Sequence, residues 1–243
     1  MGNIEIIFIG SGDAFNAGGK ANQAIWLRGP DAQILVDCGP TTLYRLQQMG
    51  RCPNDLDAIV FTHFHADHFI GVLNLDLALT LVWKRTEPIV YAAAKGLRKQ
   101  FARLYQLGYP SFSANAQLPR RFKILKPGVR SNLVDSVYIT GSPVSHNPES
   151  LGYRIEIAGK VIAITGDTGW FAQLPDLAAG ADVFISECEY YRFTGNVHHL
   201  AYEQLEPIVA GCRTVLTHTG EELLKHRDQV KCEIAQDGTQ IFL

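Results

Sequence analysis

The stretch from Val60 to His68 constrains this chain more than any other, because it packs three histidines and an aspartate into six residues. Ala58 to Phe61 has the pattern of a buried strand, and the apolar run that begins at Phe69 has helical character, so the cluster lies at a strand-to-helix turn. Such a turn gathers side chains that a regular element would direct to different faces. A lone histidine is usually solvated or hydrogen-bonded, but ligand-type side chains at this density predict a metal site.

The spacing within the cluster favours two metal ions over one. His63 and His65 are two residues apart and project to the same side of an extended segment, whereas Asp67 and His68 can turn toward a second centre. Three further candidates follow predicted strands: His146 in a loop, Asp167 in the turn 166–169, and His218. A carboxylate that bridges two metals needs an exposed, fixed position of the kind that the glycine turn at Asp167 offers.

Length and composition are those of an ordinary globular chain. With 243 residues, 47% hydrophobic and 19% charged, it can bury a sizeable core. We find no uninterrupted apolar run of membrane-spanning length and no basic region with a cleavage site at the start, which predicts a cytoplasmic protein without a membrane anchor. The five cysteines are scattered and form no Cys-x-x-Cys pair, as is typical of reduced thiols.

Positive charge is concentrated in one segment. From Lys84 to Arg130 the chain carries eleven Lys or Arg residues against the single acid Glu87. An anionic substrate or partner is one explanation, and a solvated helix face balanced by acids elsewhere is the other. The sequence leaves both open.

The order of strands and helices predicts one domain, residues 1–243, made of two similar layers. Strands are expected at the start of the chain, before the metal cluster, and in a hairpin of 151–157 with 161–165; helices are expected over 71–83, 97–107, 170–178 and 201–210. Asp37 ends a strand ahead of a helix, where it could orient a ligand histidine or cap the helix or a turn.

The ordered motifs resemble those of the metallo-beta-lactamase-fold hydrolases: His63-x-His65-x-Asp67-His68, then His146, Gly166-Asp167-Thr168, and His218 at a strand end. This resemblance covers nearly the whole chain and implies an α/β fold, a four-layer αββα sandwich. It also implies two zinc ions, although manganese or iron would suit the same ligands. By the resemblance, one zinc is held by His63, His65 and His146, the other by Asp67, His68 and His218, and Asp167 bridges them.

Within the superfamily the chain looks most like the ribonuclease Z branch, which includes phosphodiesterases and arylsulfatases. That likeness rests on residues 8–14, on Leu151-Gly152-Tyr153-Arg154, and on Ser186-Glu187 paired with a later His-Leu. It implies a catalytic pair of Glu187 and a histidine near the leaving group. We prefer His199 to the adjacent His198, since a predicted helix begins immediately after it and can fix that side chain.

Ribonuclease Z also carries a long arm that grips transfer RNA, whereas here only about twenty residues separate His146 from Asp167, as counted along the chain. We therefore expect a small anionic substrate rather than transfer RNA. The expected activity is phosphodiester hydrolysis by metal-bound hydroxide, with Asp67 orienting the hydroxide and residues 84–130 facing the substrate. The alternatives are an arylsulfatase, a lactonase or thioesterase on the same metals, or an RNA-processing or RNA-binding protein. A homodimer is one option for an oligomeric state that the sequence leaves open.

Overall fold

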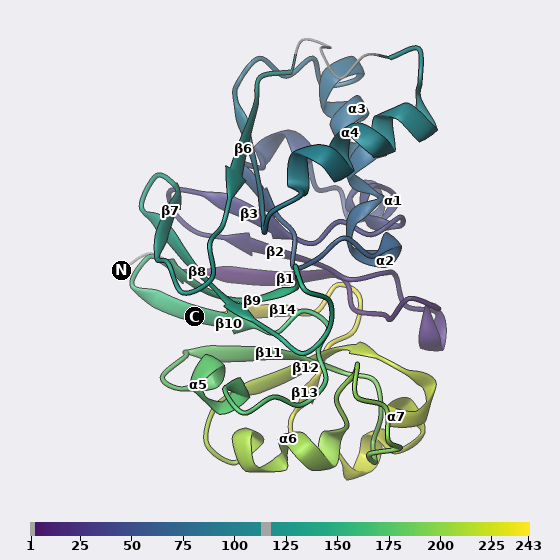
Figure 1. Ribbon diagram of the computed structural model, residues 1–243, viewed down its shortest axis with the longest axis vertical. Coiled ribbons are helices and arrows are strands. Elements are labelled where there is room, and N and C mark those ends of the chain that lie inside the picture. Colours follow the sequence, from purple (N-terminus) through teal and green to yellow (C-terminus); the bar gives the residue numbers. More distant parts are fainter. Residues whose placement is uncertain (1–2, 113–117) are drawn as a thin grey trace.

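Two β-sheets pack face to face between two sets of helices in the computed structural model, which describes residues 3–112 and 118–243 (Figure 1). The first sheet contains, in spatial order, β14 (Gln240–Phe242), β1 (Glu5–Gly10), β2 (Ala24–Arg28), β3 (Gln33–Val36), β4 (Ala58–Val60), β5 (Ile89–Ala93) and β6 (Arg120–Ile124). The second contains β13 (Glu233–Ile234), β12 (Thr214–Thr219), β11 (Val183–Cys188), β10 (Lys160–Ile164), β9 (Leu151–Ile157), β8 (Val137–Pro143) and β7 (Ser131–Val134).

Helices cover the outer face of each sheet. The first sheet is covered by α1 (Thr42–Gln48), α2 (Ala66–Phe69), α3 (Val72–Leu81) and α4 (Leu97–Gly108). The second is covered by α5 (Leu174–Ala178), α6 (Tyr202–Val209) and α7 (Glu221–Lys225). This αββα arrangement confirms the predicted fold class.

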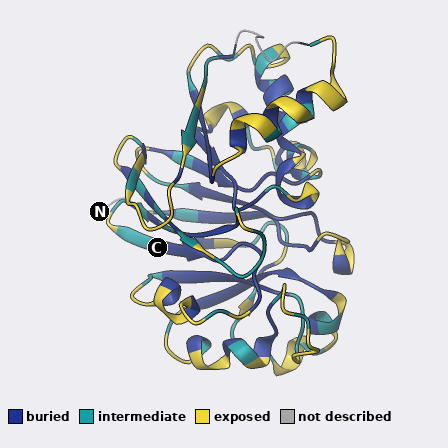
Figure 2. Cartoon of the chain, viewed as in Figure 1, coloured by how far each residue is buried: buried dark blue, intermediate teal, exposed yellow. Residues whose placement is uncertain are grey.

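Strand β1 shows why the sheets are buried on both faces. Ile6 and Phe8 contribute to the core between the sheets, whereas Ile7 and Ile9 contribute to the core under the helices. Successive side chains of a strand point to opposite faces, so a strand inside a layered fold is apolar at nearly every position. The burial map shows the result, with dark strands at the centre and exposed residues on the outer helices (Figure 2).

Parallel pairing gathers the polar side chains at one edge of the fold. Strands β3 to β6 are mutually parallel, and so are β10 to β13. The carboxyl ends of parallel strands meet at the same edge of a sheet. Asp37, Asp167, Glu187 and His218 all lie at or just after such ends. The backbone N–H of Leu151 donates to the carbonyl of Thr62 at 3.0 Å and ties the two sheets together there.

Most predicted elements are present, with one clear difference. The hairpin of β9 and β10 and the basic helix α4 match their expected ranges closely. The helix expected over 170–178 begins only at Leu174. Just before this range, the N–H of Gly169 donates to the carbonyl of Ser145 at 2.9 Å in an isolated bridge between loops, so the chain enters the segment in a non-helical conformation. Within residues 3–112 and 118–243, no helix has the length and apolar character needed to cross a membrane.

Candidate functional site

The loop between β4 and α2 carries the histidine cluster. His63 lies in the extended part of this loop and is buried, while His65 precedes α2 and is exposed. The first turn of α2 then places Asp67 and His68 on the buried side. The two pairs of ligand-type residues therefore point to different positions, as the spacing predicts.

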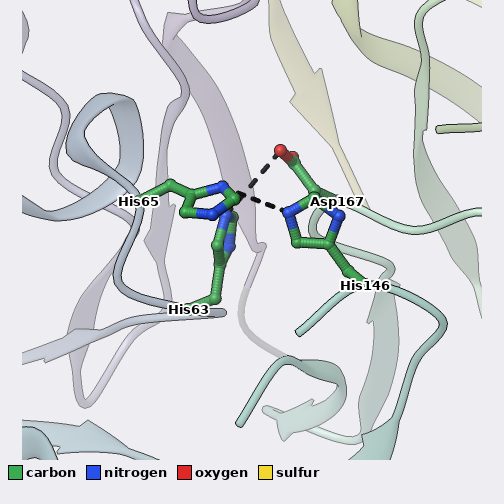
Figure 3. Close-up of side chains that lie close together, drawn as sticks. All are labelled: His63, His65, His146 and Asp167. Atoms are coloured by element: carbon green, nitrogen blue, oxygen red, sulfur yellow. Dashed lines mark hydrogen bonds and ion pairs between the residues drawn. The ribbon is translucent and has the colours of Figure 1, made fainter. Parts of the chain in front are cut away.

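A first group of side chains brings together His63, His65, His146 and Asp167 (Figure 3). One ligand-type atom from each lies within 4.8 Å of those of the others. Nδ1 of His65 is 3.1 Å from Nε2 of His146, and Nε2 of His63 is 3.7 Å from Oδ2 of Asp167. These residues come from both sheets, so the group forms only when the sheets pack.

A second group shares Asp167 and adds Asp67, His68 and His218, again with ligand-type atoms within 4.8 Å of one another. Nε2 of His68 lies 3.1 Å from Oδ2 of Asp67 and 3.1 Å from Oδ1 of Asp167. Nε2 of His218 lies 3.2 Å from Oδ2 of Asp67. Asp167 therefore lies between two sets of potential ligands, at the place that a bridging carboxylate would occupy.

Unsatisfied buried atoms test whether these groups fit a metal. Among the described residues, six buried side-chain atoms have no hydrogen-bond partner, and four of them belong to the site: Nε2 of His63, Nε2 of His68, Oδ1 of Asp167 and Nδ1 of His218. Buried polar atoms are normally paired, and imidazole and carboxylate groups are the ligands of catalytic zinc sites. The donor set therefore fits divalent metal ions.

The protonation states agree with this fit. Burial lowers the pKa of His63 well below its usual value and lowers that of His146 to about 4, which favours the neutral imidazole that binds metals. Burial alone would raise the pKa values of Asp67 and Asp167, but the neighbouring histidines outweigh it and lower both. Burial opposes protonation of His68 and His218 as well, yet the nearby carboxylates, Asp167 first, raise both pKa values, that of His218 to about 9. The carboxylates beside His68 and His218 therefore favour a positive charge in the second group, which a bound metal ion would supply.

Asp37 orients one of the candidate ligands. Its Oδ2 lies 2.8 Å from Nδ1 of His68, and its Oδ1 accepts a hydrogen bond from the N–H of Thr62 at 2.8 Å. Asp37 makes no cap for α1, whose N-terminal residue Thr41 has no side-chain capping bond. Of the two roles that the sequence left open, the contacts favour orientation of a histidine. The hydrogen bond holds Nδ1 of His68 and leaves Nε2 directed at Asp67 and Asp167.

The turn that presents Asp167 requires glycine. Gly166 has a positive φ of 61°, and a Cβ at this position would lie 2.6 Å from Cβ of Thr62. Any other residue would be strained and would displace the loop that carries His63. The N–H of Thr168 donates to Oε1 of Glu187 at 2.7 Å, which fixes the turn on its other side.

The buried Glu187 pairs with the half-buried His199 beside the metal-type groups. Nδ1 of His199 is 3.0 Å from Oε1 of Glu187, whose Oε2 accepts a hydrogen bond from the N–H of Leu200 at 3.2 Å. Burial opposes protonation of His199, but the hydrogen bond and charge of Glu187 outweigh it and raise its pKa. Burial raises the pKa of Glu187. His198 is exposed and instead offers its backbone carbonyl to Nδ1 of His146, at 3.2 Å.

A pocket of about 260 Å³ opens beside His199 and the metal-type groups. It is lined by Asp13, Ala14, Phe15, His65, Asp67, Asp167, Glu189, Tyr190, Asn196, His199 and His218. The sequence motifs assign no role in the site to Asp13, Phe15, Glu189, Tyr190 or Asn196, although Asp13 belongs to the motif of residues 8–14. Burial raises the pKa of Glu189 to about 7.

No described residue of the basic segment lines this pocket, and the expectation that residues 84–130 face the substrate stays a prediction. Several of its charges have structural partners instead. Arg120 binds the buried carboxylate of Asp76, and Nζ of Lys123 donates to the carbonyls of Asn132 and Leu133. Arg130 pairs with Glu156.

Comparison with known proteins agrees with the fold. The ribonuclease Z of Pyrococcus abyssi (strain GE5 / Orsay) is 29% identical over 153 residues, which are 62% of this chain and 47% of the relative. The match thus spans about half the length of that curated relative. The metallo-beta-lactamase fold protein YhfI from Bacillus subtilis has a TM-score of 0.82 at 21% identity, covering 100% of both chains. The short form of human tRNase Z has a TM-score of 0.77 at 23% identity, covering 98% of both.

A protein-family model described as anti-Pycsar protein Apyc1 matches residues 4–241, nearly the whole chain. The match includes every candidate metal ligand and the Glu187–His199 pair. The chain therefore belongs to the anti-Pycsar protein Apyc1 family, within the metallo-beta-lactamase-fold hydrolase superfamily.

Proposed function

We propose that this protein is a dinuclear zinc-dependent phosphodiesterase that acts on a small phosphodiester or nucleotide-like substrate. The observation that carries the proposal is the position of Asp167, common to two groups of potential ligands, beside the Glu187–His199 pair. His63, His65 and His146 would hold one zinc, Asp67, His68 and His218 the other, and Asp167 both. When bound, such ions lower the pKa of water and polarise a phosphoryl oxygen.

Side chains around this centre would orient the attacking water and protonate the leaving group. Oδ2 of Asp67 faces Nε2 of His68 and Nε2 of His218, the atoms with which it would share a zinc, and this leaves Oδ1 to orient the attacking water. His199 carries its proton on the ring nitrogen away from Glu187 and donates it to the departing oxygen, since its raised pKa favours the protonated form. Glu187 keeps the imidazole in the orientation that this transfer needs.

The size and charge of the pocket support a small substrate. Its volume of about 260 Å³ is slightly below the range of small-molecule sites, which span roughly 300–1,000 Å³. Among its described lining residues are four carboxylates, of Asp13, Asp67, Asp167 and Glu189, and no lysine or arginine. An anionic substrate would therefore depend on bound divalent ions for its affinity.

The chain segment between His146 and Asp167 supports the same choice. It forms the compact hairpin of β9 and β10, whose turn at Ala158 and Gly159 leaves no room for a protruding arm. Transfer RNA is therefore a poorer candidate than a mononucleotide-sized diester.

Zinc-loaded protein should be assayed against bis(p-nitrophenyl) phosphate, p-nitrophenyl sulfate, a lactone, a thioester and a precursor transfer RNA. We expect turnover of the phosphodiester and its loss on chelation, with recovery when zinc is restored. Turnover of the sulfate ester or the lactone, without turnover of the phosphodiester, would contradict the proposal. RNA binding that weakens with salt, without hydrolysis of any substrate, would contradict it as well.

A further inference from the structure

Phe15 has an unusual combination of exposure and position. Among the large apolar side chains of the described residues it is the most exposed, at 87%, yet it lines the pocket that contains Asp67, Asp167 and His199. A single exposed apolar residue is ordinary on a protein surface. An aromatic ring at the rim of a polar site is different, because its face is open to a ligand that enters the pocket.

The backbone around Phe15 is fixed by hydrogen bonds. Oδ1 of the buried Asp13 accepts from the N–H of Phe15 at 3.1 Å and from the N–H of Ala17 at 2.8 Å. Asn16, with a positive φ of 59°, donates from Nδ2 to the carbonyl of Lys20 at 2.8 Å. The carbonyl of Asp13 accepts from Nδ2 of Asn22 at 3.2 Å. The ring is therefore presented by a pre-organised turn, which lowers the entropic cost of using it in binding.

Other lining residues show what kind of group would bind against the ring. No lysine or arginine is among the described lining residues, so apart from the metals and His199 the pocket offers a substrate no cationic group. Tyr190 accepts a hydrogen bond from Nδ2 of Asn196 at 3.0 Å, and its hydroxyl hydrogen has no acceptor among the described residues. That hydrogen is available to an acceptor atom of a ligand.

We propose that Phe15 determines specificity by stacking on the planar base of the substrate, while the hydroxyl of Tyr190 donates to a polar atom of the same ligand. This inference rests on the proposed phosphodiesterase function and assigns a role to residues outside the metal-type groups. Stacking on an aromatic side chain needs no complementary charge and suits a neutral heterocycle.

The test compares a substrate that has a base with one that lacks it. Zinc-loaded wild type and Phe15→Ala should be assayed with a purine nucleoside 3′,5′-cyclic monophosphate and with the base-free methyl riboside 3,5-cyclic phosphate. We expect Phe15→Ala to reduce kcat/KM about 5- to 150-fold on the first, mainly through KM, and less than about twofold on the second. Phe15→Trp should retain activity, and Phe15→Leu should fall between. Phe242→Ala is the matched control, since Phe242 is 62% exposed and does not line the pocket.

Equal losses on both substrates would overturn the stacking role, because they would indicate a general distortion of the turn. No loss on either would overturn it as well. If the wild type hydrolyses neither diester, the proposed function fails, and stacking is then judged by calorimetry with adenosine 5′-monophosphate and ribose 5-phosphate. Tighter binding of the nucleotide to wild type, reduced in Phe15→Ala, would sustain the role of Phe15, and equal affinities would refute it.

Discussion

Nδ1 of His199 lies 3.0 Å from Oε1 of Glu187, a carboxylate that is 1% exposed and whose two oxygens also accept hydrogen bonds from the backbone of Thr168 and Leu200. Three donors thus converge on one buried acid. These contacts fix the carboxylate, and His199 is the member of the pair that lines the pocket.

This relationship predicts a pH effect. The pKa of His199 is raised, with the Glu187 carboxylate as the cause, and only the protonated imidazole can donate to a leaving group. Activity should therefore fall as the pH rises above that pKa. Replacement Glu187→Gln removes the charge, so the decline in kcat/KM should begin at lower pH than in wild type. The profile is measured with a poor leaving group, for which protonation matters most.

A loss of kcat in Glu187→Gln with an unshifted pH profile would assign the glutamate a purely structural role. The matched control is His198→Ala. The imidazole of that exposed residue has no hydrogen bond to Glu187, so the profile should be unchanged.

Asp37 should govern metal affinity without binding metal. Its carboxylate holds Nδ1 of His68, and loss of such a partner typically lowers metal affinity about 10- to 100-fold. We expect Asp37→Ala to show this decrease in a competition titration with a zinc chelator, and Asp37→Asn, which keeps an acceptor, to show less. Asp31→Ala, at an exposed carboxylate, serves as the control. Unchanged zinc affinity in Asp37→Ala would refute the orienting role.

The buried pair of Asp76 and Arg120 should dominate the stability of the α3–α4 layer. Asp76 is completely buried and accepts hydrogen bonds from Tyr91, Tyr105 and Arg120. Removing one partner of a buried pair costs about 3–5 kcal/mol, because a charge remains uncompensated. Chemical denaturation of Asp76→Ala should show a loss of this size. Glu156→Gln breaks an exposed pair with Arg130 and should leave the denaturation midpoint nearly unchanged.

The fold and the metal-type groups could be predicted because their signals are local in the sequence. The alternating apolar strands, and ligand-type residues directly after them, place His63, Asp167 and His218 at strand ends whatever the details of packing. For Asp37, the sequence alone leaves two possible roles, and it does not predict the contact with His68. The side chain of Asp37 could serve a helix or a histidine, and the choice depends on how β3 and β4 align.

The features that could not be predicted depend on contacts between segments that are distant in the sequence. Phe15 lines the pocket because the turn after β1 lies next to the loop after β11 in the fold. No sequence motif predicts that these two segments are neighbours. The partners of the basic segment are distant in the sequence for a related reason. Arg120 is bound by Asp76, 44 residues earlier, so a charge that looks available along the chain is neutralised in the fold.

The most direct test of the central claim is the zinc content of each chain, measured by inductively coupled plasma mass spectrometry on protein of known concentration alongside phosphodiester turnover. Two zinc ions per chain are expected in the wild type. One is expected in His146→Ala, with turnover reduced by orders of magnitude, because His146 belongs to only one of the two groups that share Asp167. A wild-type protein with full turnover and one zinc ion per chain would contradict the dinuclear site.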